Sequence, residues 1–259
     1  MQQQNVQLAA NHGGPLHYLG NRFLTLPDTS GHMHPDLSWL EEHFSVLKAN
    51  QKEKYRRCIE PFSGSASWSL AAMELDLSEE YIINDSNHIL INTLQLIRDN
   101  PQAIKESYSL LVEQYNQTAS KKQFFIDIIQ SYNNKIDEDS QALILPFIIN
   151  HSWSGILFHD SQKRILYREG SLVNGTATPR YLEKANLTVE LFNTEVDRVS
   201  LLFNTHRVHF SSGDFLGLIA DIKPNDFIAL NPPYPENERS LEEKTGMYTE
   251  LHAPKQLHE

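Results

Sequence analysis

Residues 226–234, Asp-Phe-Ile-Ala-Leu-Asn-Pro-Pro-Tyr, join a strand-like segment to a short group of polar and aromatic side chains. The apolar run Phe227 to Leu230 has the length of a buried β-strand, and prolines end it because proline cannot donate a hydrogen bond to a sheet ladder. Asn231 therefore follows the carboxyl end of a strand. In open α/β sheets, ligands bind at this end of the strands.

The side chains that follow this strand suit the activation of an aromatic amine, whose lone pair is delocalised into its ring. The Asn231 side-chain oxygen and the Pro232 carbonyl can each accept one N–H of the amine, while Tyr234 stacks on the base. A strand followed by a proline-rich turn explains the same residues without any function. The motif is therefore interpreted together with the rest of the chain.

Composition limits the class of protein. A chain of 259 residues, 40% of them hydrophobic, can bury a large core as one domain with an insertion or as two domains. A single cysteine, Cys58, excludes a disulfide framework, and the twelve histidines include no HExxH pair, so we expect no metal site. Without a membrane-length apolar run or a signal-peptide pattern, we expect a cytoplasmic protein.

A net charge of -11 argues against loose nucleic-acid binding, which depends on Lys and Arg. Residues 150–182 differ from the rest, since they are rich in turn and β-forming residues and carry a local surplus of basic side chains. This pattern predicts an extended loop or hairpin that contacts phosphates. The candidate nucleic-acid-binding residues are Lys163, Arg164, Arg168 and Arg180.

Two strand ends carry a candidate cofactor site. Residues 57–68 predict a strand that Pro61 ends, a turn around Gly64 where the backbone can approach a ligand, and a helix. Such a loop can hold the methionine part of a nucleoside–amino-acid cofactor. A second strand, Tyr81 to Asp85, ends in a carboxylate 25 residues beyond Glu60. In Rossmann-like sheets the ribose-binding acid lies about 20 residues on, so Asp85 fits that role.

The remaining segments are predicted from periodicity and capping residues. Apolar spacing predicts an amphipathic helix over 36–49, a helix capped by Asn87 and closed at Asn100-Pro101, and an all-helical insertion from 104 to 149. A third strand, about Val208 to Phe210, leads to Asp214-Phe215. This pair can bind and flank an adenine ring, or Asp214 can cap a helix over 215–220.

In this order, the stretches resemble the Dam family of DNA adenine N6-methyltransferases, which use S-adenosyl-L-methionine. The matching segments begin with Tyr18 to Arg22, a Tyr-x-Gly-Asn-Arg in place of the family's Tyr-x-Gly-(Gly/Asn)-Lys. The others are Glu60 to Ser65, Asn84-Asp85, Asn150 to Phe158, Asp214-Phe215 and Asn231 to Tyr234, where Asn-Pro-Pro-Tyr replaces the family's usual Asp-Pro-Pro-Tyr.

The resemblance implies an α/β, Rossmann-like methyltransferase sheet that methylates adenine in double-stranded DNA after flipping the base out of the helix. It implies that Tyr18, Arg22, Glu60, Phe62, Gly64, Asp85, Asp214 and Phe215 bind the cofactor. It implies that Asn231, Pro232, Pro233 and Tyr234 are catalytic.

We expect three parts: residues 1–100 with the cofactor loops, 101–205 as a mostly helical target-recognition insertion, and 206–259 with the catalytic motif. Only 25 residues follow Tyr234, so we expect the sheet to be incomplete unless a further segment or a partner completes it. Two alternatives stay open: a methyltransferase acting on RNA adenine or protein glutamine, and an inactive cofactor-binding remnant that serves as an interaction protein.

Overall fold

The centre of the computed structural model is a parallel four-stranded sheet in the order β5-β2-β1-β6. The structure describes residues 15–16, 46, 48–49, 53–135, 137–152, 155, 157–160, 162–168, 172 and 188–232. The strands are β1 (Tyr55–Glu60), β2 (Ser78–Asp85), β5 (Arg207–Ser212) and β6 (Asp226–Ile228).

The strand order reverses beside β1. The chain runs outward from β1 to β2 and β5, then returns to the other side of β1 to form β6. A crevice at such a reversal, at the carboxyl ends of the strands, is where doubly wound α/β proteins bind their ligands. The predicted α/β class is confirmed.

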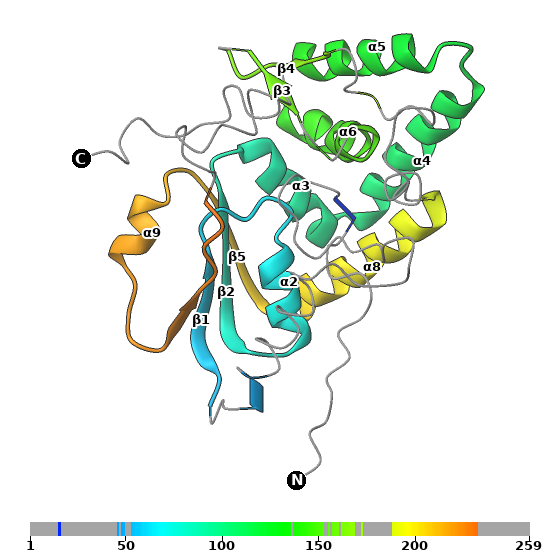
Figure 1. Cartoon of the computed structure of the whole chain (residues 1–259). Helices are drawn as coiled ribbons and strands as arrows, with labels where there is room; N and C mark the ends of the chain where they lie inside the picture. Colours follow the sequence, from blue (N-terminus) through cyan, green and yellow to red (C-terminus); the bar gives the residue numbers. More distant parts are fainter. Residues whose placement is uncertain are drawn as a thin grey trace, which may run out of the picture.

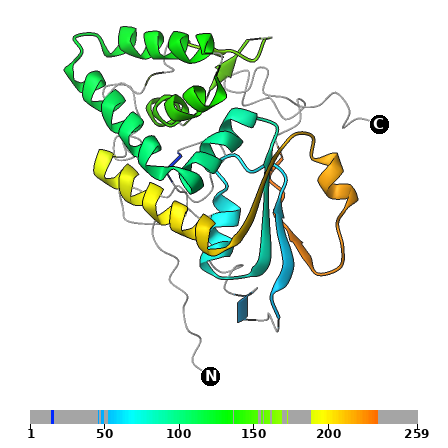
Figure 2. The same ribbon diagram turned by 180° about the vertical axis from the view of Figure 1, so that it is seen from behind.

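Three helices cover one face of the sheet: α2 (Ser67–Glu74), α3 (His88–Asp99) and α8 (Val189–Thr205). The short helix α9 (Leu216–Ala220) lies on the β6 side, away from them (Figures 1 and 2). Between sheet and helices lie fully buried side chains such as Tyr81, Leu70 and Phe203. This apolar layer fixes the strands whose ends form the candidate site.

A second group of helices lies beyond the carboxyl-end edge of the sheet (Figure 1). It contains α4 (Pro101–Gln117), α5 (Lys121–Asn134) and α6 (Glu138–His151), with the hairpin of β3 (Phe158–His159) and β4 (Ile165–Leu166). The helical pattern predicted for 104–149 and the hairpin predicted within 150–182 are confirmed for these described residues. Helix α8, within 101–205, packs against α3 and β5 as well as α4, so it touches both groups.

Local sequence explains where the helices begin. The Asn87 side chain accepts a hydrogen bond from the Leu90 N–H (3.2 Å) and starts α3, as predicted. Helix α3 ends at Asp99, and Asn100 caps α4 with Pro101 in the first turn, where the missing N–H costs nothing. Of the helix predicted over 36–49, the described residues Val46, Lys48 and Ala49 are helical.

One prediction about β6 is wrong. We expected Phe227 to Leu230 to form a buried strand, but β6 ends at Ile228, is only half-buried, and leaves Leu230 57% exposed. The reason is its position, since β6 pairs with β1 alone among the described residues and forms an edge of the sheet there. Within the described part of the chain, no helix is both long and apolar enough to cross a membrane.

Candidate active site

The loop after β1 is tied to the end of β2. The Ser63 N–H donates to the Asn84 carbonyl (2.9 Å), and the Asn84 side-chain N–H donates to the Pro61 carbonyl (3.0 Å). Gly64 has a left-handed φ of 51°, which costs glycine little, and its N–H donates to Asp85 Oδ2 (2.9 Å). The structure therefore brings Gly64 and Asp85, two predicted cofactor-binding residues, into direct contact.

Asp85 is held by the backbone on both sides. Its Oδ2 accepts the Gly64 N–H and its Oδ1 accepts the Asn87 N–H (2.9 Å). Each carboxylate oxygen can accept more than one hydrogen bond, so an oriented carboxylate of this kind is suited to ribose hydroxyls. Its orientation is fixed by the loop on one side and by the start of α3 on the other.

Glu60 lies inside the protein rather than on the surface of the loop, with 1% of its area exposed. Its carboxylate accepts hydrogen bonds from the first turn of α2, from the Ser69 N–H (2.9 Å), the Ser69 hydroxyl (2.6 Å) and the Trp68 N–H (3.3 Å). Burial raises the pKa of Glu60 to about 7 although these hydrogen bonds oppose the shift. Glu60 therefore anchors α2 beneath the loop, and its contact with a cofactor stays a prediction.

The aromatic residues predicted to line the site also come together. The rings of Phe62 and Phe215 lie 4.7 Å apart between centroids, at 46°. Asp214 is exposed, and its Oδ1 accepts the Leu216 N–H (2.8 Å), so it starts the turn into α9. The helix predicted over 215–220 begins at Leu216, with Phe215 rather than Asp214 at its N-cap. Its contact with adenine stays a prediction.

Asn84 has a role at this edge of the sheet that the sequence motif does not predict. It is buried, donates to the Pro61 and Gly213 carbonyls (3.0 and 3.2 Å), and accepts from the Ser211 hydroxyl (2.9 Å). One amide side chain thus joins the carboxyl ends of β1, β2 and β5. A polar residue directly before Asp85 at a strand end is the signal that points to it.

Asn231 lies at the same edge of the sheet. The Ala229 N–H donates to the Ile59 carbonyl (2.9 Å), which continues the β1–β6 ladder past Ile228. Two residues later, just past the end of the pairing between β1 and β6, Asn231 is partly buried and Pro232 is exposed. The other predicted site residues, Tyr18, Arg22, Pro233 and Tyr234, lie outside the described residues.

Three of the four basic residues predicted to contact nucleic acid lie in or directly after the β3–β4 hairpin. Lys163 and Arg164 are exposed in its turn, and Arg164 pairs with Asp160 (2.7 Å). The Arg168 guanidinium lies 4.6 Å from the centroid of the Phe158 ring. Arg180 lies outside the described residues. The hairpin thus presents cations and an aromatic ring beyond the carboxyl-end edge of the sheet.

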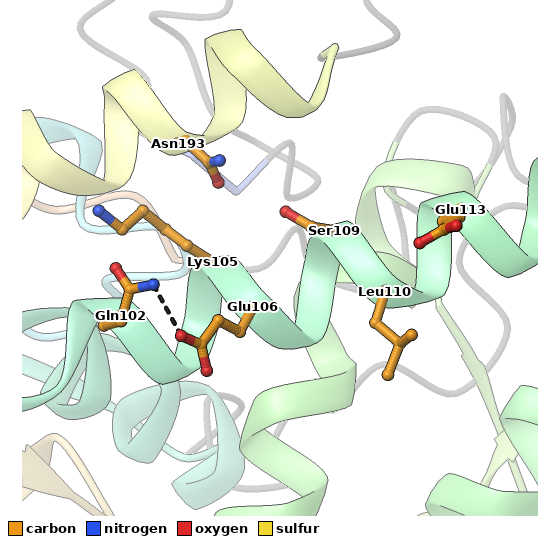
Figure 3. A pocket seen from close by; sticks show the side chains of 7 residues that line it. All are labelled: Gln102, Lys105, Glu106, Ser109, Leu110, Glu113 and Asn193. Atoms are coloured by element: carbon orange, nitrogen blue, oxygen red, sulfur yellow. Dashed lines mark hydrogen bonds between the residues drawn. The ribbon is translucent and has the colours of Figure 1, made fainter.

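A pocket of about 380 Å³ lies elsewhere, between α4 and α8. Figure 3 shows Asn193 projecting from α8 toward Lys105 on α4, and the Gln102 amide donating to Glu106 within α4 (2.8 Å). No predicted site residue lines this pocket. The described residues also contain no group of three or more His, Cys, Asp or Glu that could hold a metal ion.

The strand order, the loop bound to an acid at the end of β2 and the Asn-Pro pair after β6 define a Rossmann-like methyltransferase. The model of the D12 class N6 adenine-specific DNA methyltransferase family matches residues 36–256, and the chain belongs to this family. The resemblance noted in the sequence is confirmed.

A curated relative gives a second comparison. The chain is 26% identical over 187 residues to the "Type II methyltransferase M1.LlaDCHI" of Lactococcus lactis subsp. cremoris. The match covers 70% of this chain and 58% of the relative. The chain therefore spans somewhat more than half the length of that protein.

Proposed function

We propose that the chain is an S-adenosyl-L-methionine-dependent methyltransferase that methylates the N6 amine of adenine in double-stranded DNA. The observation that carries this proposal is the position of Asn231 and Pro232. They follow β6 directly beside β1, at the strand reversal where the Gly64–Asp85 contact forms. Membership of the D12 class family supports the same reaction.

The residues at this edge fit a nucleoside sulfonium donor. Asp85 offers fixed acceptors for ribose hydroxyls, and the Phe62–Phe215 pair offers apolar surface for an adenine ring. The left-handed Gly64 lets the backbone approach the amino-acid part. When bound, the donor supplies an electrophilic methyl group, and every other element of the reaction comes from the chain and the DNA.

The chain's own part in the reaction is to orient the target amine. The Asn231 side-chain oxygen and the Pro232 carbonyl each accept one N–H, which draws the lone pair of the amine out of conjugation with the ring. Asn231 is a neutral amide, so it positions the amine and does not remove its proton. The proton leaves to solvent after the methyl group has been transferred.

The DNA side of the proposal rests on the hairpin. Lys163, Arg164 and Arg168 place positive charge beyond the edge of the sheet that holds Asn231, on a chain whose net charge is -11. Phosphate contacts position a duplex without reading its sequence. The hairpin therefore gives an acidic protein a local surface for the DNA backbone beyond the carboxyl-end edge of the sheet, the edge that holds the candidate catalytic residues.

The test is transfer of a labelled methyl group from S-adenosyl-L-methionine to three acceptors in parallel: double-stranded DNA, single-stranded RNA and a glutamine-containing peptide. The proposal predicts label in DNA, recovered as N6-methyladenine after digestion. Label found only in RNA or only in the peptide would show that the substrate is RNA or protein rather than DNA. Cofactor binding without transfer to any of the three would favour a cofactor-binding protein without activity.

A further inference from the structure

Two serine side chains in the loop after β1 are buried without a partner. Ser63 and Ser65 are 5% and 4% exposed, and neither hydroxyl has a hydrogen-bond partner among the residues that the structure describes. Buried hydroxyls in native proteins are almost always hydrogen-bonded, because leaving one unpaired costs about 1–3 kcal/mol. Two such groups within three residues call for a physical reason.

The backbone that carries these two hydroxyls is held in a fixed conformation. Ser63 is fixed through its N–H to Asn84 and through its carbonyl, which accepts the Ala66 N–H (2.7 Å). Ser65 stands between two left-handed residues, Gly64 with φ 51° and Ala66 with φ 61°. A left-handed alanine is unfavourable by about 1–2 kcal/mol. Strain of this kind persists where the surrounding structure holds it, and it is concentrated at ligand sites.

Among the residues that the structure describes, the groups assigned so far leave one part of a bound donor without a side-chain partner. Asp85 is placed for the ribose, and the Phe62–Phe215 pair for the adenine. The carboxylate of the amino-acid part still needs hydrogen-bond donors. Glu60, the acid at the start of this loop, cannot repel that carboxylate strongly, because its own oxygens are turned into the first turn of α2. Hydroxyls are suitable donors for a carboxylate.

We propose that Ser63 and Ser65 bind the methyl donor by donating hydrogen bonds from their hydroxyls to the carboxylate of its methionine part. This inference rests on the proposed function and assigns two further cofactor-binding residues within it. It gives these two side chains a part in recognising the amino-acid end of the donor, which the backbone at Gly64 also approaches. The nucleoside end is bound by other groups.

The experiment compares Ser63→Ala and Ser65→Ala with the unchanged chain by calorimetry. Two ligands are used: S-adenosyl-L-homocysteine, which has the amino-acid part, and 5′-methylthioadenosine, which lacks it. Each variant should bind S-adenosyl-L-homocysteine roughly 10-fold more weakly or worse, since a hydrogen bond to a charged group is lost. The dissociation constant for 5′-methylthioadenosine should stay within about 2-fold.

Ser78→Ala is the matched control. Ser78 is 2% exposed and its hydroxyl also lacks a partner among the described residues, but it lies at the amino end of β2, on the opposite edge of the sheet. All three variants remove a buried unpaired hydroxyl, so each should raise the melting temperature of the cofactor-free protein. Only the two loop variants should weaken binding of S-adenosyl-L-homocysteine.

The outcomes separate this inference from the function on which it rests. If the unchanged chain binds neither S-adenosyl-L-methionine nor S-adenosyl-L-homocysteine, the proposed cofactor is wrong and this inference is lost with it. If the unchanged chain binds and both loop variants bind equally well, only the role of the hydroxyls is refuted. Equal weakening of both ligands, or weakening by Ser78→Ala, would also refute that role.

Discussion

At the scale of single residues, Glu60 shows what a loop motif leaves open. The resemblance implies that Glu60 binds the cofactor, and the structure adds that its carboxylate is turned into the first turn of α2. The N–H groups of a helix start favour an anion, but burial outweighs them and raises the pKa to about 7. Neither the direction of a side chain nor its burial can be predicted from a loop motif.

This pKa predicts a pH effect on stability. Glu60 holds its proton more tightly when folded (pKa about 7) than when unfolded (4.5), so its stabilising contribution is complete below pH 4.5 and is lost as pH rises toward 7. The loss is on the order of 3 kcal/mol. Glu60→Gln cannot titrate, so its free energy of unfolding should fall less over this range in urea melts at several pH values.

His151 also contributes to the pH dependence of stability in this range. Burial lowers its pKa to about 4, so it changes stability in the opposite sense as pH rises from 4 to 6.5. It is present in both proteins, so the difference between them isolates Glu60. Parallel pH profiles for Glu60→Gln and the unchanged chain would contradict the raised pKa.

Asp85 gives a second prediction at this scale. Replacing it with alanine removes the proposed ribose acceptor and the partners of the Gly64 and Asn87 N–H groups. The dissociation constant for S-adenosyl-L-methionine should rise about 10-fold or more, because hydrogen bonds to a charged group are worth about 1.5–3 kcal/mol. Calorimetry measures the change. An unaltered dissociation constant would show that Asp85 does not bind the cofactor.

At the scale of elements, an ion-pair network attaches β6 to β1. The Arg57 guanidinium donates to both Asp226 (2.8 Å) and Asp221 (2.9 Å), and the Asp226 side chain is completely shielded from solvent. Burial favours the neutral form of Asp226, yet the hydrogen bonds from Arg57 lower its pKa overall. The bond to Asp226 raises the pKa of Arg57 in turn. The network fixes the strand that leads to Asn231.

Breaking this network should be costly. Arg57→Met leaves the Asp226 carboxylate buried with fewer partners, so the free energy of unfolding should fall by about 3 kcal/mol. Arg207→Met is the control, because its pair with Glu80 joins β5 to β2 with the Arg207 side chain 70% exposed, and such pairs contribute below about 1 kcal/mol. If urea melts show that the two variants lose the same free energy of unfolding, the buried Arg57–Asp226 pair does not stabilise the protein more than an exposed pair does.

The elements also show what the sequence can and cannot predict. Capping places α3 correctly, and apolar spacing predicts the helical insertion to which most of α4 belongs, because these signals are local. The strand predicted over Tyr81 to Asp85 lies within β2, which begins three residues earlier at Ser78. The burial of β6 was predicted wrongly, since four apolar residues do not reveal whether a strand has one neighbour or two. The Arg57–Asp226 pair joins residues far apart in the chain, and no local pattern indicates it.

At the scale of the whole molecule, the order of short motifs was enough to predict an α/β methyltransferase, because their order reflects the order of strand ends around one site. Single motifs were much weaker evidence. In the structure Gly64 contacts Asp85 and Phe62 contacts Phe215, while their binding of a cofactor stays a prediction. The joining of three strand ends by Asn84 and the buried Ser63 and Ser65 hydroxyls appear only once the strands are placed.

The position of the hairpin beyond the sheet edge predicts how the protein depends on salt. Lys163→Ala should weaken DNA binding similarly for all sequences and reduce the slope of log affinity against log salt by about 1. Arg207 lies at the amino end of β5, so Arg207→Ala should leave both the DNA affinity and the salt slope unchanged. Fluorescence anisotropy at several salt concentrations measures the slopes. An unaltered slope for Lys163→Ala would place the duplex elsewhere.

The most direct test of the central claim is methyl transfer from labelled S-adenosyl-L-methionine to double-stranded DNA by the unchanged chain and by Asn231→Ala, with the cofactor dissociation constant measured on both. We expect transfer to fall by at least about 100-fold in the variant, because a group that stabilises the transition state is lost. The dissociation constant should change less than about 2-fold. Full activity in Asn231→Ala, or a loss of cofactor binding as large as the loss of transfer, would contradict the role of Asn231 in holding the amine.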